Sequence, residues 1–437
     1  MASQKGEATE RLIANVNFSS WIAETLKVSP DSRRVAYGAC IGNKWLVVVD
    51  GQEGQQYDGI GTTIIFSPDS RRVAYVAGIG NKCLVVVDGQ KGKQYDNIGM
   101  GTPIFSPDSR RVGYGGIVGN KQLFIVDGQE GKQYDGIGVL IFSSDGRRVA
   151  YGARVGNKQL VIVDGQEGIQ YDGIGVLIFS PDGRRVAYGA KVGNNWLVVV
   201  DGEEGKQYDG IMKGYPIFSP DSHRVAYATG IGNKWLVVVD GQQGKLYDGI
   251  LDGSLIFSPD SRRVAYGTGI GNKQFVVVDG QEGKQYDGIG TAPIFSSDSR
   301  RVAYGAGIGN KRFIVVDGQE GKQYDGIGAG TPIFSPDSQK VAYIARVRNK
   351  QSVVVDGQEG KQYDEIGAGT IIFSPDSRRV AYVAGIGNKC LVVVDGQEGK
   401  QYDAIVKGGE PIFDSPDRLR YLAQLGSQIF LVEEQFR

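Results

Sequence analysis

The sequence contains few of the residues from which catalytic and metal sites are usually built. Its 437 residues include a single histidine, His223, and three cysteines, Cys40, Cys83 and Cys390. A Ser-His-Asp triad or a zinc site would depend almost entirely on His223, and an odd, sparse set of cysteines makes no disulfide framework. We therefore predict no catalytic residue, no metal and no cofactor, and we interpret His223 as a surface substitution.

The sequence also lacks an excess of charge and a long apolar run. Lys plus Arg and Asp plus Glu both number 49, which argues against a nucleic-acid-binding protein, because such proteins present a basic surface. No apolar run approaches the ~20 residues of a membrane span. Residues 1–10 are polar and lack the apolar core of a signal peptide. These features predict a cytoplasmic protein, or a periplasmic or extracellular one if a leader has been removed.

What the sequence has instead is a repeat. The Asp of a VVVDG-like phrase recurs every 37 to 39 residues, at Asp50, Asp88, Asp127, Asp164, Asp201, Asp240, Asp279, Asp317, Asp356 and Asp395. An SPD-like phrase recurs with the same spacing, and glycine is abundant, at 67 residues. Self-similarity at such a period indicates a solenoid, a propeller or an array.

Each copy is consistent with four short strands. In one copy these are Ile65-Phe66, residues 72–75, residues 84–87 and a short segment around residues 94–96. The turns between them contain Pro, Asp, Gly and Asn, which favour tight turns. The unbroken Val run of the third strand indicates burial on both faces, as in a blade between two neighbours. We therefore predict an all-β fold, a closed β-propeller of four-stranded antiparallel blades.

The two ends of the chain predict how the ring closes. We assign residues 1–437 to one domain, with 1–10 as a disordered tail, 11–22 as a closing strand, 24–406 as ten full repeats and 411–437 as three strands of a last blade. Residues 17–21 align with the fourth strand of a repeat, so the N-terminal strand would complete the C-terminal blade. This gives eleven blades. The alternative is ten blades with the tail packed outside.

The SPD phrase also carries a resemblance. Residues 66–70 (FSPDS) and 179–183 (FSPDG) resemble the Pro-Asp type of WD-like repeat found in the TolB-type propeller family. The similarity covers the chain from about residue 24 and implies a propeller fold. The Gly-His and Trp-Asp signatures of true WD repeats are absent, as are the extra domain that precedes TolB-type propellers and the Gly-x-Ser-x-Gly elbow of hydrolases. The resemblance therefore leaves the activity open.

The differences between copies suggest where a partner would bind. If the strands alternate in direction, the invariant SPDSRR and DGQEGK turns share one face, and the variable segments share the other. The variable segments are the links before each first strand, such as Val139-Leu140, and the first residue of each third strand. From them we select seven candidate binding residues, Trp45, Trp196, Trp235, Arg312, Lys213, Tyr215 and Asp252. The other interpretation of this variation is unconstrained surface drift.

The sequence thus favours a non-enzymatic, monomeric binding or scaffolding propeller whose partner is a protein. The alternative is a multivalent lectin, in which recurrent Tyr, Asp and Asn side chains bind a glycan at equivalent sites between blades. We expect no nucleic-acid partner and no membrane partner. Paired carboxylates such as Asp50 and Asp58 recur in every copy, and we interpret them as turn-capping residues rather than as a catalytic pair.

Overall fold

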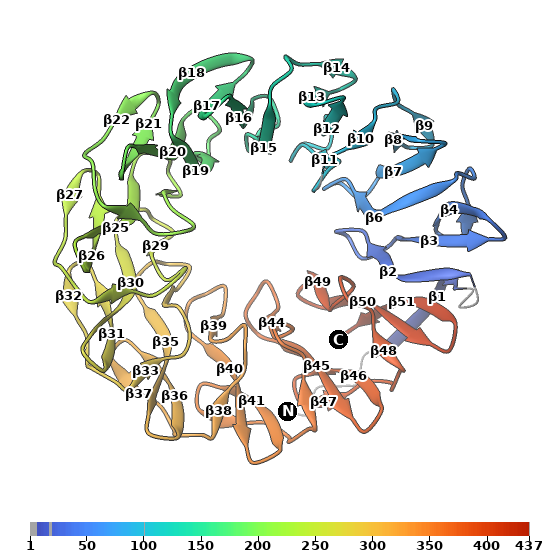
Figure 1. Ribbon diagram of the computed structural model, residues 1–437. Coiled ribbons are helices and arrows are strands. Elements are labelled where there is room, and N and C mark those ends of the chain that lie inside the picture. Colours follow the sequence, from blue (N-terminus) through green and yellow to red (C-terminus); the bar gives the residue numbers. More distant parts are fainter. Residues whose placement is uncertain (1–6, 17–19, 100, 437) are drawn as a thin grey trace.

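A computed structural model describes residues 7–16, 20–99 and 101–436 of the chain. Over these residues the strands form eleven antiparallel sheets that follow one another around a ring (Figure 1). The prediction of an eleven-bladed, closed β-propeller is confirmed. We number the blades 1 to 11 in chain order and call their strands A to D, from the centre outward.

Strand A is the innermost strand of each blade and exists in two forms. In blades 1, 2, 4 and 5 it is continuous, and in the other seven blades a loop divides it into two short segments that both pair with strand B. The continuous strands are β2 (Trp21–Val28), β6 (Gly59–Phe66), β15 (Gly136–Phe142) and β19 (Gly173–Phe179). The divided strands are β10 (Asn97–Ile98) with β11 (Ile104–Phe105), β23 (Gly210–Ile211) with β24 (Ile217–Phe218), β28 (Gly249–Ile250) with β29 (Ile256–Phe257), β33 (Gly288–Ile289) with β34 (Ile294–Phe295), β38 (Gly326–Ile327) with β39 (Ile333–Phe334), β43 (Glu365–Ile366) with β44 (Ile372–Phe373), and β48 (Ala404–Ile405) with β49 (Ile412–Ser415).

Strands B and C form the buried middle of each blade, and their Val, Ile, Leu and Ala side chains pack against both neighbouring blades. The B strands are β3 (Val35–Ile41), β7 (Val73–Ile79), β12 (Val112–Val118), β16 (Val149–Val155), β20 (Val186–Val192), β25 (Val225–Ile231), β30 (Val264–Ile270), β35 (Val302–Ile308), β40 (Val341–Val347), β45 (Val380–Ile386) and β50 (Arg418–Leu425). The C strands are β4 (Lys44–Val49), β8 (Lys82–Val87), β13 (Lys121–Val126), β17 (Lys158–Val163), β21 (Asn195–Val200), β26 (Lys234–Val239), β31 (Lys273–Val278), β36 (Lys311–Val316), β41 (Lys350–Val355), β46 (Lys389–Val394) and β51 (Gln428–Gln435).

Strand D lies on the outer rim, and in all blades but 4 and 11 it is only two residues long, because its ladder with strand C is interrupted. Its second contact with strand C is in most blades a lone bridge at the recurrent tyrosine, such as Cys83 with Tyr95. The D strands are β5 (Gln52–Glu53), β9 (Gln90–Lys91), β14 (Gln129–Glu130), β18 (Gln166–Tyr171), β22 (Glu203–Glu204), β27 (Gln242–Gln243), β32 (Gln281–Glu282), β37 (Gln319–Glu320), β42 (Gln358–Glu359) and β47 (Gln397–Glu398).

The N-terminal strand supplies strand D of blade 11, as the sequence predicted, but at a different position. Strand β1 (Glu7–Asn15) pairs antiparallel with β51 from Glu7↔Gln435 to Asn15↔Gln428, with one bulge. The predicted bounds of the closing strand, 11–22, and of the tail, 1–10, are therefore wrong in two places. Residues 7–10 belong to the closing strand and not to a disordered tail, and residues 20–22 do not belong to the closing strand. Trp21 begins strand A of blade 1 instead, and residues 17–19, used for the alignment, lie outside the described residues.

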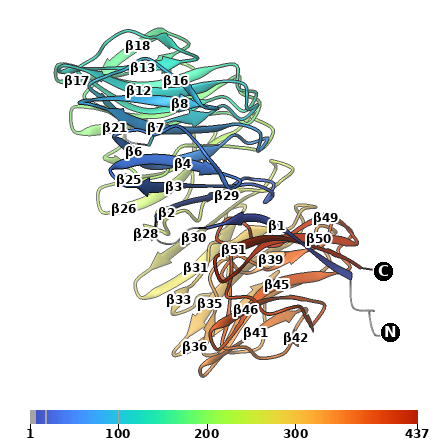
Figure 2. The same ribbon diagram turned by 90° about the vertical axis from the view of Figure 1, so that its right-hand side faces the viewer.

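The error has a physical reason. In most other blades the ladder between strands C and D is interrupted before the recurrent tyrosine. The strand β1 arrives from the other end of the chain, so no turn fixes its register, and it pairs along the whole of the longer strand β51. Figure 2 faces this seam, where β1 and β51 meet blade 1 directly. Ala14, Val16, Leu422 and Leu431 share one core with Tyr37 across it.

In most blades an arginine ties the blade to the next one, and we call this set of contacts the arginine clasp. In blade 9 a lysine replaces it, and Lys340 Nζ donates to the carbonyl oxygen of Ser377 in blade 10. In blade 2, Arg72 Nε donates to Asp88 Oδ2 at 2.9 Å, joining the A–B turn to the C–D turn. Its Nη1 donates to the carbonyl oxygens of Ser109 and Arg110 in blade 3, at 3.3 and 3.0 Å. The guanidinium carbon also lies 5.2 Å from the ring centre of Phe105 in that blade. The second arginine of the SPDSRR turn thus joins neighbouring blades.

Removing the closing strand should open the ring. A chain that begins at residue 17 loses the pairing of β1 with β51 and the burial of Ala14 and Val16, which we expect to cost on the order of 5 kcal/mol of unfolding free energy. It should melt at lower temperature and associate through the exposed edge of β51. A chain that begins at residue 7 is the matched control. Calorimetry and size-exclusion chromatography would contradict this closure if both shortened chains behaved like the full one.

The two arginines of one turn should differ in their effect on stability. Arg185 makes the clasp contacts of blade 5 and its side chain is one-third exposed, so Arg185→Ala should cost about 2 kcal/mol of unfolding free energy. Its neighbour Arg184 has a side chain that is 87% exposed, so Arg184→Ala should change that free energy by less than about 0.5 kcal/mol. Denaturant melts would measure both. Equal effects would mean that the clasp does not hold the blades together.

Candidate functional site

The recurrent Tyr, Glu and Lys of the outer rim bind one another across blade boundaries. The hydroxyl of Tyr95 donates to Glu130 Oε1 of the next blade at 2.9 Å, and Lys93 Nζ lies 2.8 Å from the same oxygen. At the seam, Glu10 of β1 takes this place and accepts from Tyr402 and Lys400. Burial first, and then the neighbouring Glu130, raises the pKa of Tyr95. The rim residues therefore serve the ring itself.

The turns between strands B and C are joined by a recurrent aspartate. Asp58 Oδ1 accepts from Lys44 Nζ of blade 1 at 2.6 Å, and Asp58 Oδ2 accepts from the backbone N–H of Gly80 in blade 2 at 2.7 Å. The Gly80 N–H, and then Lys44, lower the pKa of Asp58. The Asp of the SPD phrase is also engaged, since Asp69 Oδ1 accepts from Ser67 Oγ and from the N–H of Arg71. The turn-capping interpretation of the recurrent aspartates agrees with these contacts.

The position that varies between copies is the second residue of strand C, one residue later in the strand than the sequence predicted, and it has a structural use in four blades. There the side chain is glutamine, and its Oε1 accepts a hydrogen bond from the N–H of a strand A isoleucine in the next blade. For Gln159 this partner is Ile174, at 2.9 Å. The other three pairs are Gln122 with Ile137, Gln274 with Ile289, and Gln351 with Ile366. This position is therefore a contact between blades.

The tryptophans at the same position are half-buried and lie against glycines of their own blades. Trp196 Cζ3 would lie 3.5 Å from a Cβ placed on Gly175, and the indole of Trp235 lies similarly over Gly230. Arg312 is exposed, and its Nη1 donates to the carbonyl oxygens of Gly309 and Lys311 in its own turn. Trp45 is half-buried. The structure does not bring Trp45, Trp196, Trp235 and Arg312 together into one patch, because they belong to blades 1, 5, 6 and 8.

The other three candidates lie in the loops that divide strand A. Lys213 and Asp252 are exposed, in blades 6 and 7. Tyr215 is only 3% exposed, and its hydroxyl accepts from the N–H of Leu255 in blade 7 at 3.2 Å. The prediction that Tyr215 is an exposed contact residue is therefore wrong, because its ring is part of the core between two blades.

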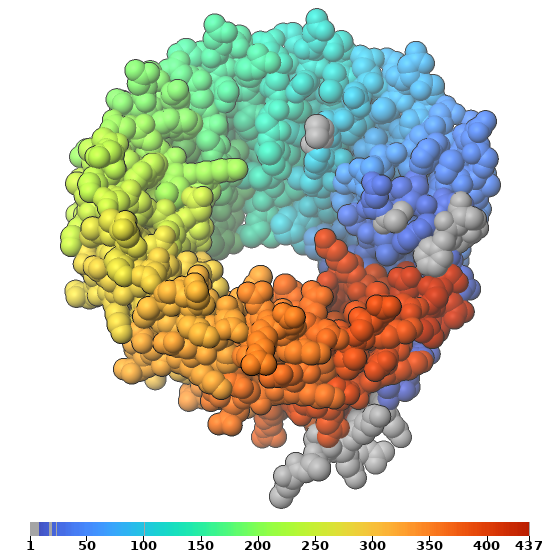
Figure 3. Space-filling view, turned by 60° about the horizontal axis from the view of Figure 1, so that its bottom comes forward, coloured from blue at the N-terminus to red at the C-terminus, as the bar shows by residue number. Residues whose placement is uncertain are grey.

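The variable links also lie elsewhere than predicted. The ladder of blade 2 pairs Ile60 with Ala77 and Ile64 with Tyr75, so Thr62 and Thr63 form a bulge within strand A. They are not at the end of the blade beside the B–C turn. Because strand A is innermost, these links face the centre of the ring, where the space-filling view shows an opening (Figures 1 and 3). The variation that the sequence placed on one face of the disc thus lies along the wall of a channel.

Blades 4 and 5 have the shortest links, and a hollow lies between them. Their repeats are 37 residues long, and strand A reads GIGVLIF in both, without the extra loop of the divided strands. The hollow has a volume of about 570 Å³. Its lining residues are Gly136, Ile137, Gly138, Val139, Ile141, Gly152, Ala153, Arg154, Gln159, Ile174, Gly175, Val176 and Leu177.

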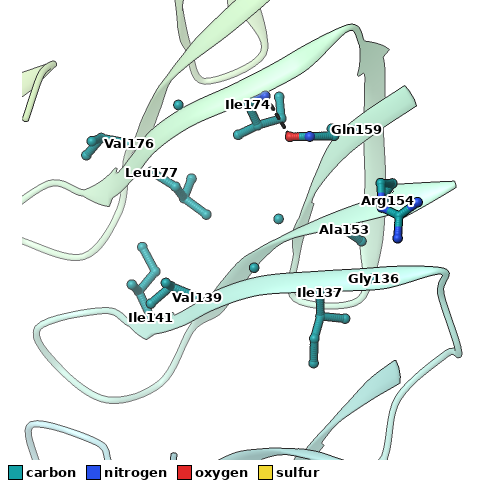
Figure 4. A pocket seen from close by; sticks show the side chains of 13 residues that line it. Gly136, Ile137, Val139, Ile141, Ala153, Arg154, Gln159, Ile174, Val176 and Leu177 are labelled. Atoms are coloured by element: carbon teal, nitrogen blue, oxygen red, sulfur yellow. Dashed lines mark hydrogen bonds between the residues drawn. The ribbon is translucent and has the colours of Figure 1, made fainter. Parts of the chain in front are cut away.

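The walls of this hollow are aliphatic. Val139 is 76% exposed and Val176 is 36% exposed, the former being the largest exposure among the exposed large apolar side chains of the described residues. Figure 4 shows Val139 and Ile141 of blade 4 gathered with Val176 and Leu177 of blade 5 toward one end, and Arg154 and Gln159 at the other. Glycines line part of the blade 4 wall, so no side chain fills the space. The signal that could have located this hollow is the pair of adjacent 37-residue repeats.

The titratable residues outside this hollow form no further site. Among the described residues no group of three or more His, Cys, Asp or Glu is arranged to hold a metal ion. His223 is exposed, with its Nδ1 2.7 Å from the carbonyl oxygen of Asp221. The three cysteines are free and half-buried. The described chain contains no helix long and apolar enough to span a membrane.

Comparison with known proteins identifies no family for this chain. No protein-family model and no curated protein matches the sequence. Solved structures with a similar arrangement include a eukaryotic initiation factor, at 16% identity and a TM-score of 0.42, covering 78% of this chain and 96% of that one. They also include TolB from Acinetobacter baumannii, at 14% identity and a TM-score of 0.27, covering 68% and 80%. A third is the propeller domain of the Trilobed protease from Pyrococcus furiosus, at 15% identity and a TM-score of 0.31, covering 60% and 94%.

The class of protein is thus a β-propeller, closed through its N-terminal strand and marked by an apolar hollow in the wall of its channel. The chain has the fold that the resemblance to TolB-type repeats implied, and this fold is compatible with many activities.

The buried tyrosines predict how the ring responds to alkali. Burial raises the pKa of Tyr382 to about 12, and the pKa of Tyr95 is also raised, against about 10 in an unfolded chain. A group whose folded pKa is raised stabilises the fold fully below its unfolded pKa, so stability should fall only as the pH rises above about 10. Tyrosinate absorbance should therefore appear together with loss of the β-sheet circular dichroism. Tyrosine ionisation near pH 10 in a ring that stays folded would contradict this.

Proposed function

We propose that this propeller is a non-enzymatic binding module that holds a protein partner against the channel wall of blades 4 and 5. The observation that carries the proposal is the exposure of aliphatic side chains, above all Val139, around a hollow that the short links leave open. An exposed apolar surface in a concave site is typical of an interaction site. The rest of the repeat is engaged in contacts between blades.

The lining of the hollow favours binding over catalysis. Its polar side chains are those of Arg154 and Gln159, and neither is a nucleophile or a general base at neutral pH. The other lining residues are Gly, Ala, Val, Ile and Leu. A partner that fills the site would therefore gain burial of apolar surface, without meeting a group that could exchange a proton with it.

A protein partner fits better than a glycan. A lectin with equivalent sites would use the recurrent Tyr and Asp side chains, yet Tyr95 and Asp58 are engaged between blades. The hollow also occurs where blades 4 and 5 differ from the other repeats, whereas a multivalent lectin would need equivalent sites in every repeat. Within this proposal Lys213 and Asp252, exposed in the channel-facing loops of blades 6 and 7, supply polar contacts beside the hollow. Trp45, Trp196, Trp235 and Arg312 would contribute only to a partner that extends onto the B–C turns.

The proposal predicts that charge in the hollow abolishes partner binding. The variant Val139→Asp with Val176→Asp should capture a partner at least tenfold more weakly, because a carboxylate would have to be desolvated against an apolar surface. The melting temperature should change little, since Val139 is exposed.

The matched control is Thr62→Asp with Thr63→Asp, which places the same two charges in the channel-facing bulge of blade 2. Pull-downs from the source lysate would compare the three proteins at equal concentration. Equal capture by all three would locate the interaction elsewhere on the ring, and loss of capture by the control alone would place it at blade 2.

A further inference from the structure

Arg154 brings a positive charge without a direct ion pair to one end of the hollow. Its Nη2 donates to the carbonyl oxygen of Asp135 at 3.0 Å, and no carboxylate of the described residues lies within 4 Å of its guanidinium. The carboxylate of Asp135 is itself engaged by Lys121 Nζ at 2.6 Å and by the N–H of Gly156 at 2.7 Å. The arginine therefore retains donors and charge for a ligand.

Most blades have no basic residue at the position of Arg154. The corresponding residue is glycine in five blades, as at Gly230 and Gly307, whereas it is Lys191 in blade 5 and Arg346 in blade 9. Blade 9 has a divided strand A, however, whose loop contains residues 328–332. Blade 4 thus combines an arginine at this position with a continuous strand A beside an open hollow.

The backbone beside the hollow is also suited to a peptide. Strands β15 and β19 are inner edge strands, and each contains a bulge where two residues have no partner in strand B. These residues are Gly138 and Val139 in β15, and Gly175 and Val176 in β19. Gln122 and Gln159 already bind the N–H groups of Ile137 and Ile174 in these strands. The other N–H and C=O groups along the open side of an edge strand can pair with an extended peptide. A fatty acid could fill the apolar space but could not satisfy these groups.

We infer that the occupant of the hollow is an extended, acidic segment of the partner protein. Its aliphatic side chains pack against Val139 and Val176, and a carboxylate pairs with Arg154. This inference rests on the proposed function of the same site. Residue 136, which pairs with Arg154, is three residues from Val139, or about 10 Å along a strand, so the carboxylate lies about three residues from the aliphatic side chain.

The test begins with a random peptide library displayed on phage and selected on the full chain. Peptides selected on the unaltered protein should be enriched in Val, Ile or Leu together with Asp or Glu. Selection on Arg154→Gln should lose the acidic enrichment. Selection on Arg346→Gln, which makes the same change at the same repeat position away from the hollow, should keep it.

Affinities of one selected peptide then measure the ion pair. Fluorescence anisotropy should show about tenfold weaker binding for Arg154→Gln, for the peptide with Glu replaced by Gln, and for both changes combined, because the second change removes nothing further. Arg346→Gln should bind as the unaltered protein does. The binding should also weaken with salt in the unaltered protein more than in Arg154→Gln.

The outcomes separate this inference from the function on which it rests. Peptide binding that is lost in Val139→Asp but unchanged by Arg154→Gln would overturn the acidic partner and leave the binding site in place. Peptides that bind Val139→Asp as well as the unaltered protein, or the failure of the library to yield any binder, would overturn both. Displacement of every selected peptide by a long-chain fatty acid of higher affinity would overturn a peptide as the occupant.

Discussion

The ring depends on the arginine clasp. One guanidinium joins two turns of its own blade, through an aspartate, and reaches two carbonyl oxygens and a phenylalanine ring of the next blade. For Arg224 these contacts are made to Asp240, to Ser261 and Arg262, and to Phe257. A single blade buries too little apolar surface to be stable alone, so a contact that fixes one blade against the next decides whether the array folds. Arg420 continues the series across the seam by donating to the carbonyl oxygen of Asp31.

Many recurrent side chains of the repeat bind a neighbouring blade. The outer rim pairs Tyr, Lys and Glu between blades, the B–C turns share aspartates, and four glutamines of strand C bind the next strand A. A residue that recurs in every blade is for this reason weak evidence of function in this protein. The informative positions are those where one complete repeat departs from the others, and blades 4 and 5 do so in link length, in exposed valines and in Arg154.

The channel gives these departures a common location. Strand A lines it, and the loops that divide strand A in seven blades fold against the wall. Where the loop is absent, as at β15 and β19, no loop side chains cover the wall, and a hollow and the edge of strand A are left open. A closed ring has no free sheet edge between blades, so the inner edges of strand A and the outer edges of strand D are where its backbone remains available. The inner edges lie in a concave, partly apolar setting, which the exposed outer rim does not offer.

The sequence by itself determined the architecture. A period of 37 to 39 residues, turn residues at fixed offsets and a Val-rich third strand specify the blade, since these signals are local and recur ten times. The incomplete last copy also determined that an N-terminal strand would close the ring. Its register, with Glu7 opposite Gln435, was decided by the tertiary structure, because no turn connects β1 to its partner. Tertiary structure alone also decided that Tyr215 is buried between blades 6 and 7, and that the variable links face a channel. Burial and proximity between blades depend on contacts between residues about forty positions apart, and no spacing within one repeat encodes them.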